Sequence, residues 1–235
     1  MSSAKLTTTT ATTTTLTAAD GHTFSAYVAH PSGTPRGALV VVQEIFGVNS
    51  HVRSVADGYA ADGYLAIAPA LFDRLERGIE IGYSAEDVQR GRALKAASGS
   101  ANALLDIAAS MAHLKAAAPP SARIGIVGYC WGGLLSWLAA CGLDGLTASI
   151  PYYGGGVPEQ ASLTPRCPVL AHFGERDAHI PLATVEAFRQ AQPGITVQIY
   201  AADHGFNCDQ RGSFDAASAT LARDRSLAFL RQHVG

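Results

Sequence analysis

The sequence predicts one α/β domain built on a mostly parallel sheet with helices on both faces. Short apolar, β-branched runs such as Ala38–Gln43 alternate with longer helical segments along most of the chain. A run of this kind suits a strand that is buried on both faces of a parallel sheet. The chain has 235 residues, and neither a repeat nor a long linker divides it. We therefore expect a single domain over residues 1–235.

The expected strands are short apolar runs bounded by glycine, proline or polar residues. They are Ala38–Gln43, Tyr64–Ala68, Arg123–Val127, Thr147–Tyr152, Val169–Phe173 and Thr196–Tyr200. The segment Leu71–Ser84 has no clear period, and we expect it to be irregular.

The expected helices lie between these strands and after the last of them. Asn49 or Ser50 can cap the first helix, and Pro119 ends the third because proline cannot continue a helix. The helices are Asn49–Ala61, Ala85–Ala97, Ser100–Ala118, Gly133–Ala140, Leu182–Ala191 and Ser213–His233.

The N-terminal region Met1–Asp20 contains the threonine runs Thr7–Thr10 and Thr12–Thr15, and no apolar core of signal-peptide type. Low complexity predicts a disordered tail over residues 1–11, whereas β-branched composition predicts a strand at a sheet edge; both interpretations stay open. The alternation over Thr12–Ala29 predicts one or two antiparallel edge strands.

The composition disfavours nucleic-acid and membrane partners. The formal net charge is −2, whereas either partner would call for a clustered basic face or a long apolar span. The four cysteines show no CxxC spacing, so we expect free thiols. We expect a cytoplasmic protein that acts on a small molecule, as a monomer or a weak homo-oligomer.

The strongest chemical signal is the segment from Gly128 to Gly132, which reads Gly-Tyr-Cys-Trp-Gly. It matches a nucleophile elbow, in which a strand turns sharply into a helix and presents the central residue above the sheet. Cys130 would then be the nucleophile, and the backbone N–H of Trp131 would face an oxyanion. The alternative is a buried structural cysteine in a glycine-rich turn, and the flanking strand and helix patterns disfavour it.

An acid and a histidine follow this segment in the order that such a site uses. Asp177 comes directly after the strand Val169–Phe173, and His204 comes after Thr196–Tyr200. Both would lie at the carboxyl ends of parallel strands, where active sites of open α/β sheets form. We expect His204 to move the proton of the nucleophile and Asp177 to orient the imidazole. Less favoured candidates are Glu175 for the acid and, for the base, His22, His51, His172 and His179.

A further acid, Glu44, follows the first buried strand. At the top of that strand it would lie over the site, and the Ile45 N–H would be the second oxyanion donor. The alternative for Glu44 is a solvated or helix-capping glutamate.

With these residues in place, the chain resembles the dienelactone hydrolase (carboxymethylenebutenolidase) family. The resemblance runs from residue 20 to the last helix, and its most specific parts are Gln43–Asn49 and Gly128–Gly133. It implies an α/β-hydrolase fold that works without a metal or organic cofactor in the degradation of aromatic compounds. It also implies that Glu44 reorients around Cys130 and helps to form the thiolate once substrate is bound.

The resemblance further implies an anionic lactone whose carboxylate is held by two arginines. Arg90 falls where one of them would be. The second would lie four residues after His204, where this chain has Cys208. Arg211 is a possible substitute, although the sequence favours a solvated surface arginine there.

The sequence therefore predicts a cysteine-dependent hydrolase that opens a dienelactone or a related small ester. The alternatives are a carboxylesterase or thioesterase of broader specificity and, from another class, a thiol redox sensor built on Cys130. Tyr152 and Tyr153 either line the pocket or pack in the core. A metal site made from Cys208, His204 and Cys130 is disfavoured because it has only three ligands, one of them the nucleophile.

Overall fold

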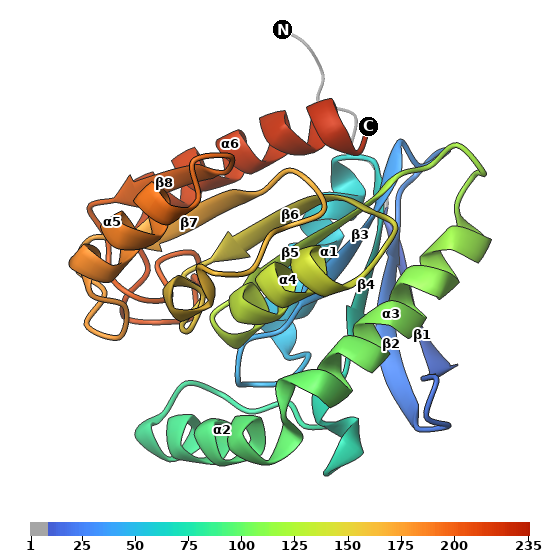
Figure 1. The fold of residues 1–235 in the computed structure, drawn as a ribbon. Coiled ribbons are helices and arrows are strands. Elements are labelled where there is room, and N and C mark those ends of the chain that lie inside the picture. The colour runs from blue at the N-terminus through green and yellow to red at the C-terminus, as the bar shows by residue number, and fades with distance from the viewer. Residues whose placement is uncertain (1–8) are drawn as a thin grey trace, which may run out of the picture.

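The computed structural model describes residues 9–235. Its strands form one eight-stranded sheet in the order β1-β2-β4-β3-β5-β6-β7-β8 (Figure 1). Neighbouring strands from β4 to β8 are parallel, and the β1–β2 and β2–β4 pairs are antiparallel. The strands are β1 (Thr10–Thr17), β2 (Thr23–His30), β3 (Gly37–Val42), β4 (Tyr64–Pro69), β5 (Ile124–Tyr129), β6 (Leu146–Tyr152), β7 (Leu170–Gly174) and β8 (Thr196–Tyr200).

Helices cover both faces of the sheet, as the βα alternation predicts. α1 and α6 lie together on one face, while α3, α4 and α5 lie on the other (Figure 1). The helices are α1 (Ser50–Ala61), α2 (Ala85–Ser98), α3 (Ser100–Ala117), α4 (Trp131–Gly142), α5 (Leu182–Ala191) and α6 (Ala216–His233), with short 3₁₀ turns at Leu71–Arg74 and Pro158–Gln160.

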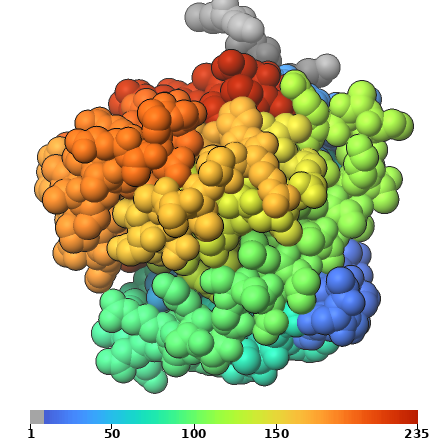
Figure 2. Space-filling model, in the orientation of Figure 1, coloured from blue at the N-terminus to red at the C-terminus, as the bar shows by residue number. Residues whose placement is uncertain are grey.

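The central strands are buried because of their composition. Every residue of β3, β4 and β5 is buried, which is what an apolar, β-branched strand covered on both faces requires. The segments pack into one continuous body, with the orange C-terminal part directly against the yellow central part (Figure 2). No helix of the described residues has the length and apolar character needed to cross a bilayer.

The structure differs from the sequence-based expectations mainly at element ends. β1 begins at Thr10, so the last two residues of the tail predicted for residues 1–11 belong to an edge strand; residues 1–8 lie outside the described part. α6 begins at Ala216 rather than at Ser213, because the Asp215 side chain caps it by accepting from the Ser218 N–H at 2.8 Å.

Candidate active site

Cys130 occupies a sharp turn between β5 and α4. Its φ is 55° and its ψ is −112°, a left-handed backbone conformation that is strained for a residue with a side chain. The turn closes only because two neighbours lack side chains. A Cβ on Gly128 would lie 2.0 Å from the Gly132 carbonyl oxygen, and one on Gly132 would lie 2.4 Å from that of Val42. The Trp131 N–H is in the first turn of α4, where no helical carbonyl can accept it.

His204 and Asp177 form a close pair at the same edge of the sheet. Asp177 follows β7 and His204 follows β8, and His204 Nδ1 lies 2.6 Å from Asp177 Oδ2. The other oxygen of Asp177 accepts from the His179 N–H at 2.8 Å. Both members of the pair are buried, whereas Glu175, the other acid weighed from the sequence, is exposed.

The surroundings of His204 favour its charged form. Burial alone would lower its pKa, but the Coulombic attraction of Cys130 and the hydrogen bonds with Asp177 and Cys130 raise the pKa to about 10. Because Nδ1 faces the carboxylate, Nε2 is left for the thiol. This arrangement holds a proton on the imidazole and is typical of a cysteine–histidine pair.

Glu44 and Arg211 form a second ion pair in the site. The Glu44 side chain is buried, and its Oε1 accepts from Arg211 Nη1 at 3.2 Å; its Oε2 is buried and has no partner within the described chain. Arg211 also lies over the rings of Phe46 and Tyr83. The expectation of a solvated surface arginine at position 211 is therefore wrong, because the buried carboxylate and the two rings hold its guanidinium inside.

Arg211 reaches Glu44 because the residue after the histidine is glycine. Gly205 has φ +80°, and a Cβ there would lie 2.4 Å from Arg211 Nη1. The sequence carries this signal, a glycine directly after His204, but its meaning depends on how the loop folds back.

The two tyrosines after β6 have different surroundings. Tyr152 directs its hydroxyl to Ser226 Oγ at 2.7 Å, and its ring packs on that of His172, so it lies in the core. The Tyr153 ring centroid lies 5.2 Å from that of His204. Its hydroxyl is buried without a partner in residues 9–235. Burial raises the pKa of Tyr153 well above its ordinary value, so the hydroxyl stays protonated and can donate.

Arg90 is not joined to these residues. Its guanidinium lies 2.8 Å from Glu76 Oε1 in an exposed ion pair. Its neighbour Gly91 nevertheless packs on the loop that begins with Glu44: a Cβ on Gly91 would lie 2.3 Å from the Ile45 carbonyl oxygen. α2 thus borders the segment that carries the expected oxyanion donor at Ile45.

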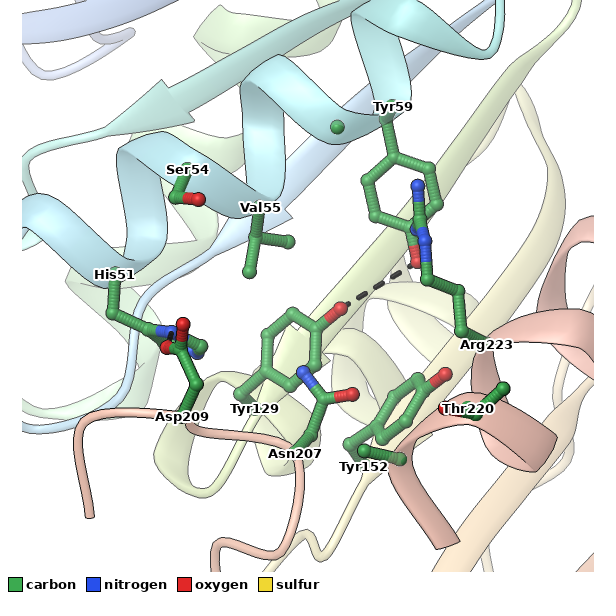
Figure 3. Close-up of a pocket in the computed structure, with 12 residues that line it drawn as sticks. His51, Ser54, Val55, Tyr59, Tyr129, Tyr152, Asn207, Asp209, Thr220 and Arg223 are labelled. Atoms are coloured by element: carbon green, nitrogen blue, oxygen red, sulfur yellow. Dashed lines mark hydrogen bonds and ion pairs between the residues drawn. The ribbon is translucent and has the colours of Figure 1, made fainter. Parts of the chain in front are cut away.

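A cavity of about 260 Å³ lies beside the site, between α1 and α6 (Figure 3). Tyr129 and Tyr152 line it, and each directly precedes a residue of the site, Cys130 or Tyr153. Neither Cys130 nor His204 is among its lining residues. The cavity is therefore a neighbour of the candidate site.

Comparisons with known proteins show what this chain is similar to. Residues 24–234 match the model of the dienelactone hydrolase family. A Synechocystis sp. protein, provisionally named carboxymethylenebutenolidase, is 37% identical over 84% of this chain and 87% of its own. The carboxymethylenebutenolidase of Pseudomonas putida is 32% identical over 90% of this chain and 92% of its own.

A solved structure shows the same architecture. The crystal structure of a Klebsiella pneumoniae protein, provisionally named dienelactone hydrolase, has a TM-score of 0.86 and 32% identity to this chain. The likeness covers 96% of this chain and 100% of that one.

Proposed function

The chain belongs to the dienelactone hydrolase family and is a hydrolase of ester or lactone bonds, and from this premise we propose that Cys130, His204 and Asp177 carry out the hydrolysis. The proposed substrate is a small anionic lactone of the dienelactone type. The observation that carries the proposal is the position of the His204 imidazole, coupled to Asp177 on one side and to Cys130 on the other.

In the first half of the reaction, the Cys130 thiolate attacks the lactone carbonyl carbon and forms a C–S bond. The carbonyl oxygen becomes an alkoxide, which the backbone N–H groups of Ile45 and Trp131 stabilise. When the alkoxide collapses, the ring C–O bond breaks and His204 gives its proton to the leaving oxygen. Asp177 keeps the imidazole oriented and stabilises its charged form.

In the second half, water attacks the thioester that joins the acyl group to Cys130. His204, now neutral, takes a proton from the water, and the C–S bond breaks to release the thiolate and a carboxylic acid, which loses its proton to solvent. The enzyme returns to its starting state with no cofactor consumed. Tyr153, a protonated donor beside His204, is suited to bind an oxygen of the substrate.

Glu44 and Arg211 support an anionic substrate. A substrate carboxylate can compete with Glu44 for the Arg211 guanidinium, since both offer the same paired oxygens. Released from Arg211, Glu44 would be a base next to the thiol, which is the role that family membership implies for it. Arg211 would thereby replace the arginine that is missing at Cys208.

The proposal is tested by measuring hydrolysis of a dienelactone and of p-nitrophenyl acetate. We expect Cys130→Ala and His204→Ala each to lower kcat at least about 1,000-fold, because the pair acts as a unit. Cys208→Ala should retain much of the activity, because this buried thiol is not the nucleophile. Turnover that survives Cys130→Ala would rule out the proposed nucleophile.

The same substrates and variants separate this proposal from its two alternatives, a broad esterase and a thiol redox sensor. A broad esterase would hydrolyse the neutral ester as well as the anionic lactone. A thiol redox sensor would instead consume peroxide in a manner that depends on both Cys130 and Cys208. The full burial of Cys208 disfavours it as a resolving cysteine.

A further inference from the structure

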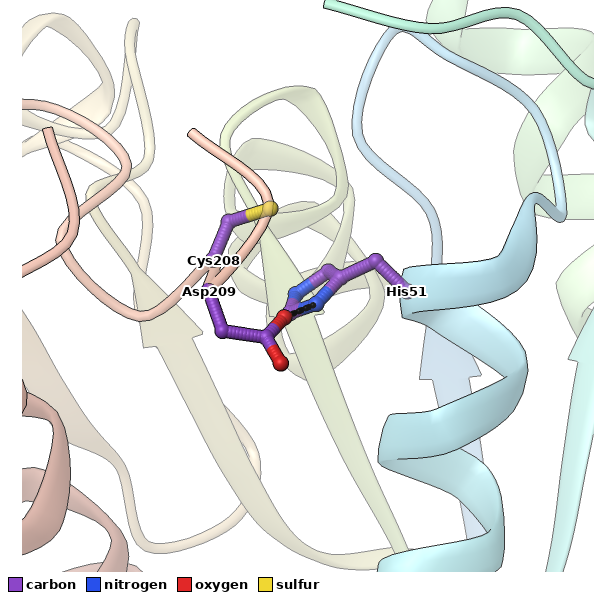
Figure 4. A group of neighbouring side chains, drawn as sticks. All are labelled: His51, Cys208 and Asp209. Carbon is purple, nitrogen blue, oxygen red and sulfur yellow. Dashed lines mark hydrogen bonds and ion pairs between the residues drawn. The ribbon is translucent and has the colours of Figure 1, made fainter. Parts of the chain in front are cut away.

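The structure brings together three side chains with metal-binding atoms that the proposed reaction does not use: His51, Cys208 and Asp209 (Figure 4). His51 is the second residue of α1, and the other two lie on the loop that follows His204. One imidazole nitrogen, the thiol sulfur and one carboxylate oxygen lie within 4.8 Å of one another. Two segments that are distant in the sequence thus supply a mixed nitrogen, sulfur and oxygen donor set.

His51 presents one nitrogen to this cluster from a buried position. The residue is only 4% exposed. Its Nδ1 lies 3.0 Å from Asp209 Oδ1, so this nitrogen and the carboxylate face each other and can bind one ion between them.

The spacing of the cluster is close to that of a tetrahedral zinc site. With zinc about 2.0 Å from nitrogen and oxygen and about 2.3 Å from sulfur, the donor atoms lie about 3.3–3.5 Å apart. The His51–Asp209 separation is already 3.0 Å, and the sulfur lies within 4.8 Å of both other donor atoms, so it must approach by at most about 1.3 Å. Asp209 is exposed, so its carboxylate can move toward the sulfur.

A metal ligand suits Cys208 better than a second nucleophile does. The residue is fully buried, so a reactant in solution cannot readily reach its sulfur. An ion could still enter, because the cavity between α1 and α6 is lined by His51 and Asp209 (Figure 3).

We propose that His51, Cys208 and Asp209 bind one borderline-soft divalent cation of the zinc class, with water as the fourth ligand. Binding forms a metal–sulfur bond and releases the Cys208 thiol proton to solvent. The ion cross-links the start of α1 to the loop that carries His204. It takes no part in the hydrolysis, and the proposal stands whether or not Cys130 is the nucleophile.

The test uses Cd²⁺, whose bond to a thiolate produces an ultraviolet charge-transfer band that does not depend on activity. The metal-free protein is titrated in a Cys130→Ser background, so that Cys130 and His204 cannot contribute a competing site. Cys141 and Cys167 remain in every variant and serve as internal controls. The variants added to this background are Cys208→Ser, Asp209→Asn and, as a matched exposed carboxylate, Asp224→Asn.

We expect one cadmium–thiolate band in the Cys130→Ser protein and none after Cys208→Ser is added. Asp209→Asn should weaken binding about tenfold or more, and Asp224→Asn should leave it unchanged. Because Asp209 is exposed, its variant keeps the test decisive even if Cys208→Ser fails to fold. A band that survives Cys208→Ser, the absence of any band, or equal affinities for the two aspartate variants would overturn the proposal.

Discussion

Removing the charge of Asp177 is the most direct test of how the site stabilises the charged form of His204. Asp177→Asn keeps the size of the side chain but removes the charge that helps to raise the pKa of His204. We expect kcat to fall about 100- to 10,000-fold, and the alkylation of Cys130 by iodoacetamide to slow at neutral pH.

Asp203→Asn is the matched control for this prediction. Its carboxylate accepts from the His204 backbone N–H at 2.7 Å but does not touch the imidazole. It should retain most of the activity. Equal losses in the two variants would mean that loop structure, and not the charge on Asp177, explains the effect.

Arg211 and Arg90 are the two arginines that could bind a substrate carboxylate. Arg211 is held inside the site by Glu44, whereas Arg90 forms an exposed pair with Glu76. We expect Arg211→Gln to raise KM for an anionic lactone about tenfold or more, the value of one charge-assisted contact, with little effect on a neutral ester. Arg90→Gln should also raise KM for the anionic lactone more than KM for the neutral ester, but by a smaller factor than Arg211→Gln.

Steady-state kinetics on matched anionic and neutral substrates check this comparison. If both variants changed KM for the neutral ester as much as for the anionic lactone, neither guanidinium would recognise the carboxylate. The role of the Arg211–Glu44 pair would then be limited to structure.

At the scale of elements, the turn from β5 to α4 depends on Gly132. A methyl group there would lie 2.4 Å and 2.6 Å from the backbone carbonyl oxygens of Val42 and Gln43, which cannot move without disturbing β3. We expect Gly132→Ala to lower the free energy of unfolding by about 2–4 kcal/mol. Chemical denaturation measures this loss.

The other end of the same helix offers the control. A Cβ on Gly142 meets nothing within 4 Å. Gly142→Ala should therefore change the free energy of unfolding by less than about 1 kcal/mol, in the stabilising direction. A similar loss in both variants would contradict the close-contact explanation for Gly132.

Most elements could be predicted because their signals are local. The expected strand Thr196–Tyr200 and the expected helix Leu182–Ala191 have the same bounds in the structure, since each is an uninterrupted periodic segment between breaking residues. The end of the tail could not be predicted, because threonine runs suit both a disordered segment and an edge strand. Only pairing with β2 distinguishes the two.

The residues of the candidate site could be predicted only where they directly follow a predicted strand. Asp177 and His204 each follow a strand directly, and the structure pairs them. Arg211 was expected on the solvated surface because its position depends on a loop that winds back through successive turns. The Cys208 N–H donates to the Gly205 carbonyl at 3.0 Å, and the Arg211 N–H donates to the Cys208 carbonyl at 3.1 Å. No sequence period signals such a path.

For the whole molecule, acid stability should depend on a histidine that takes no part in the proposed reaction. His172 is fully buried between Tyr200 and Ser226; burial, with a contribution from Arg225, lowers its pKa to about 3. Because the unfolded chain binds this proton near pH 6.5, the stability that His172 contributes is complete above that pH. It is lost as the pH falls toward 3.

We expect the free energy of unfolding to fall by up to about 1.4 kcal/mol per pH unit from this group below pH 6.5. His172→Gln should be less stable at pH 7 but show a shallower slope between pH 6.5 and 4 in urea denaturation. The partly exposed His113 gives the control His113→Gln, which should keep the native slope. An unchanged slope in His172→Gln would refute the assignment.

The loop that follows β8, residues 201–215, has a consequence for laboratory evolution of new substrate preferences. It holds His204 and Arg211 seven positions apart and locks the guanidinium against Gly205. Insertions or randomised codons there would disturb proton transfer and anion recognition at once, so most clones would be inactive. Libraries directed at α2, which borders the Ile45 loop through Gly91, spare the reacting groups.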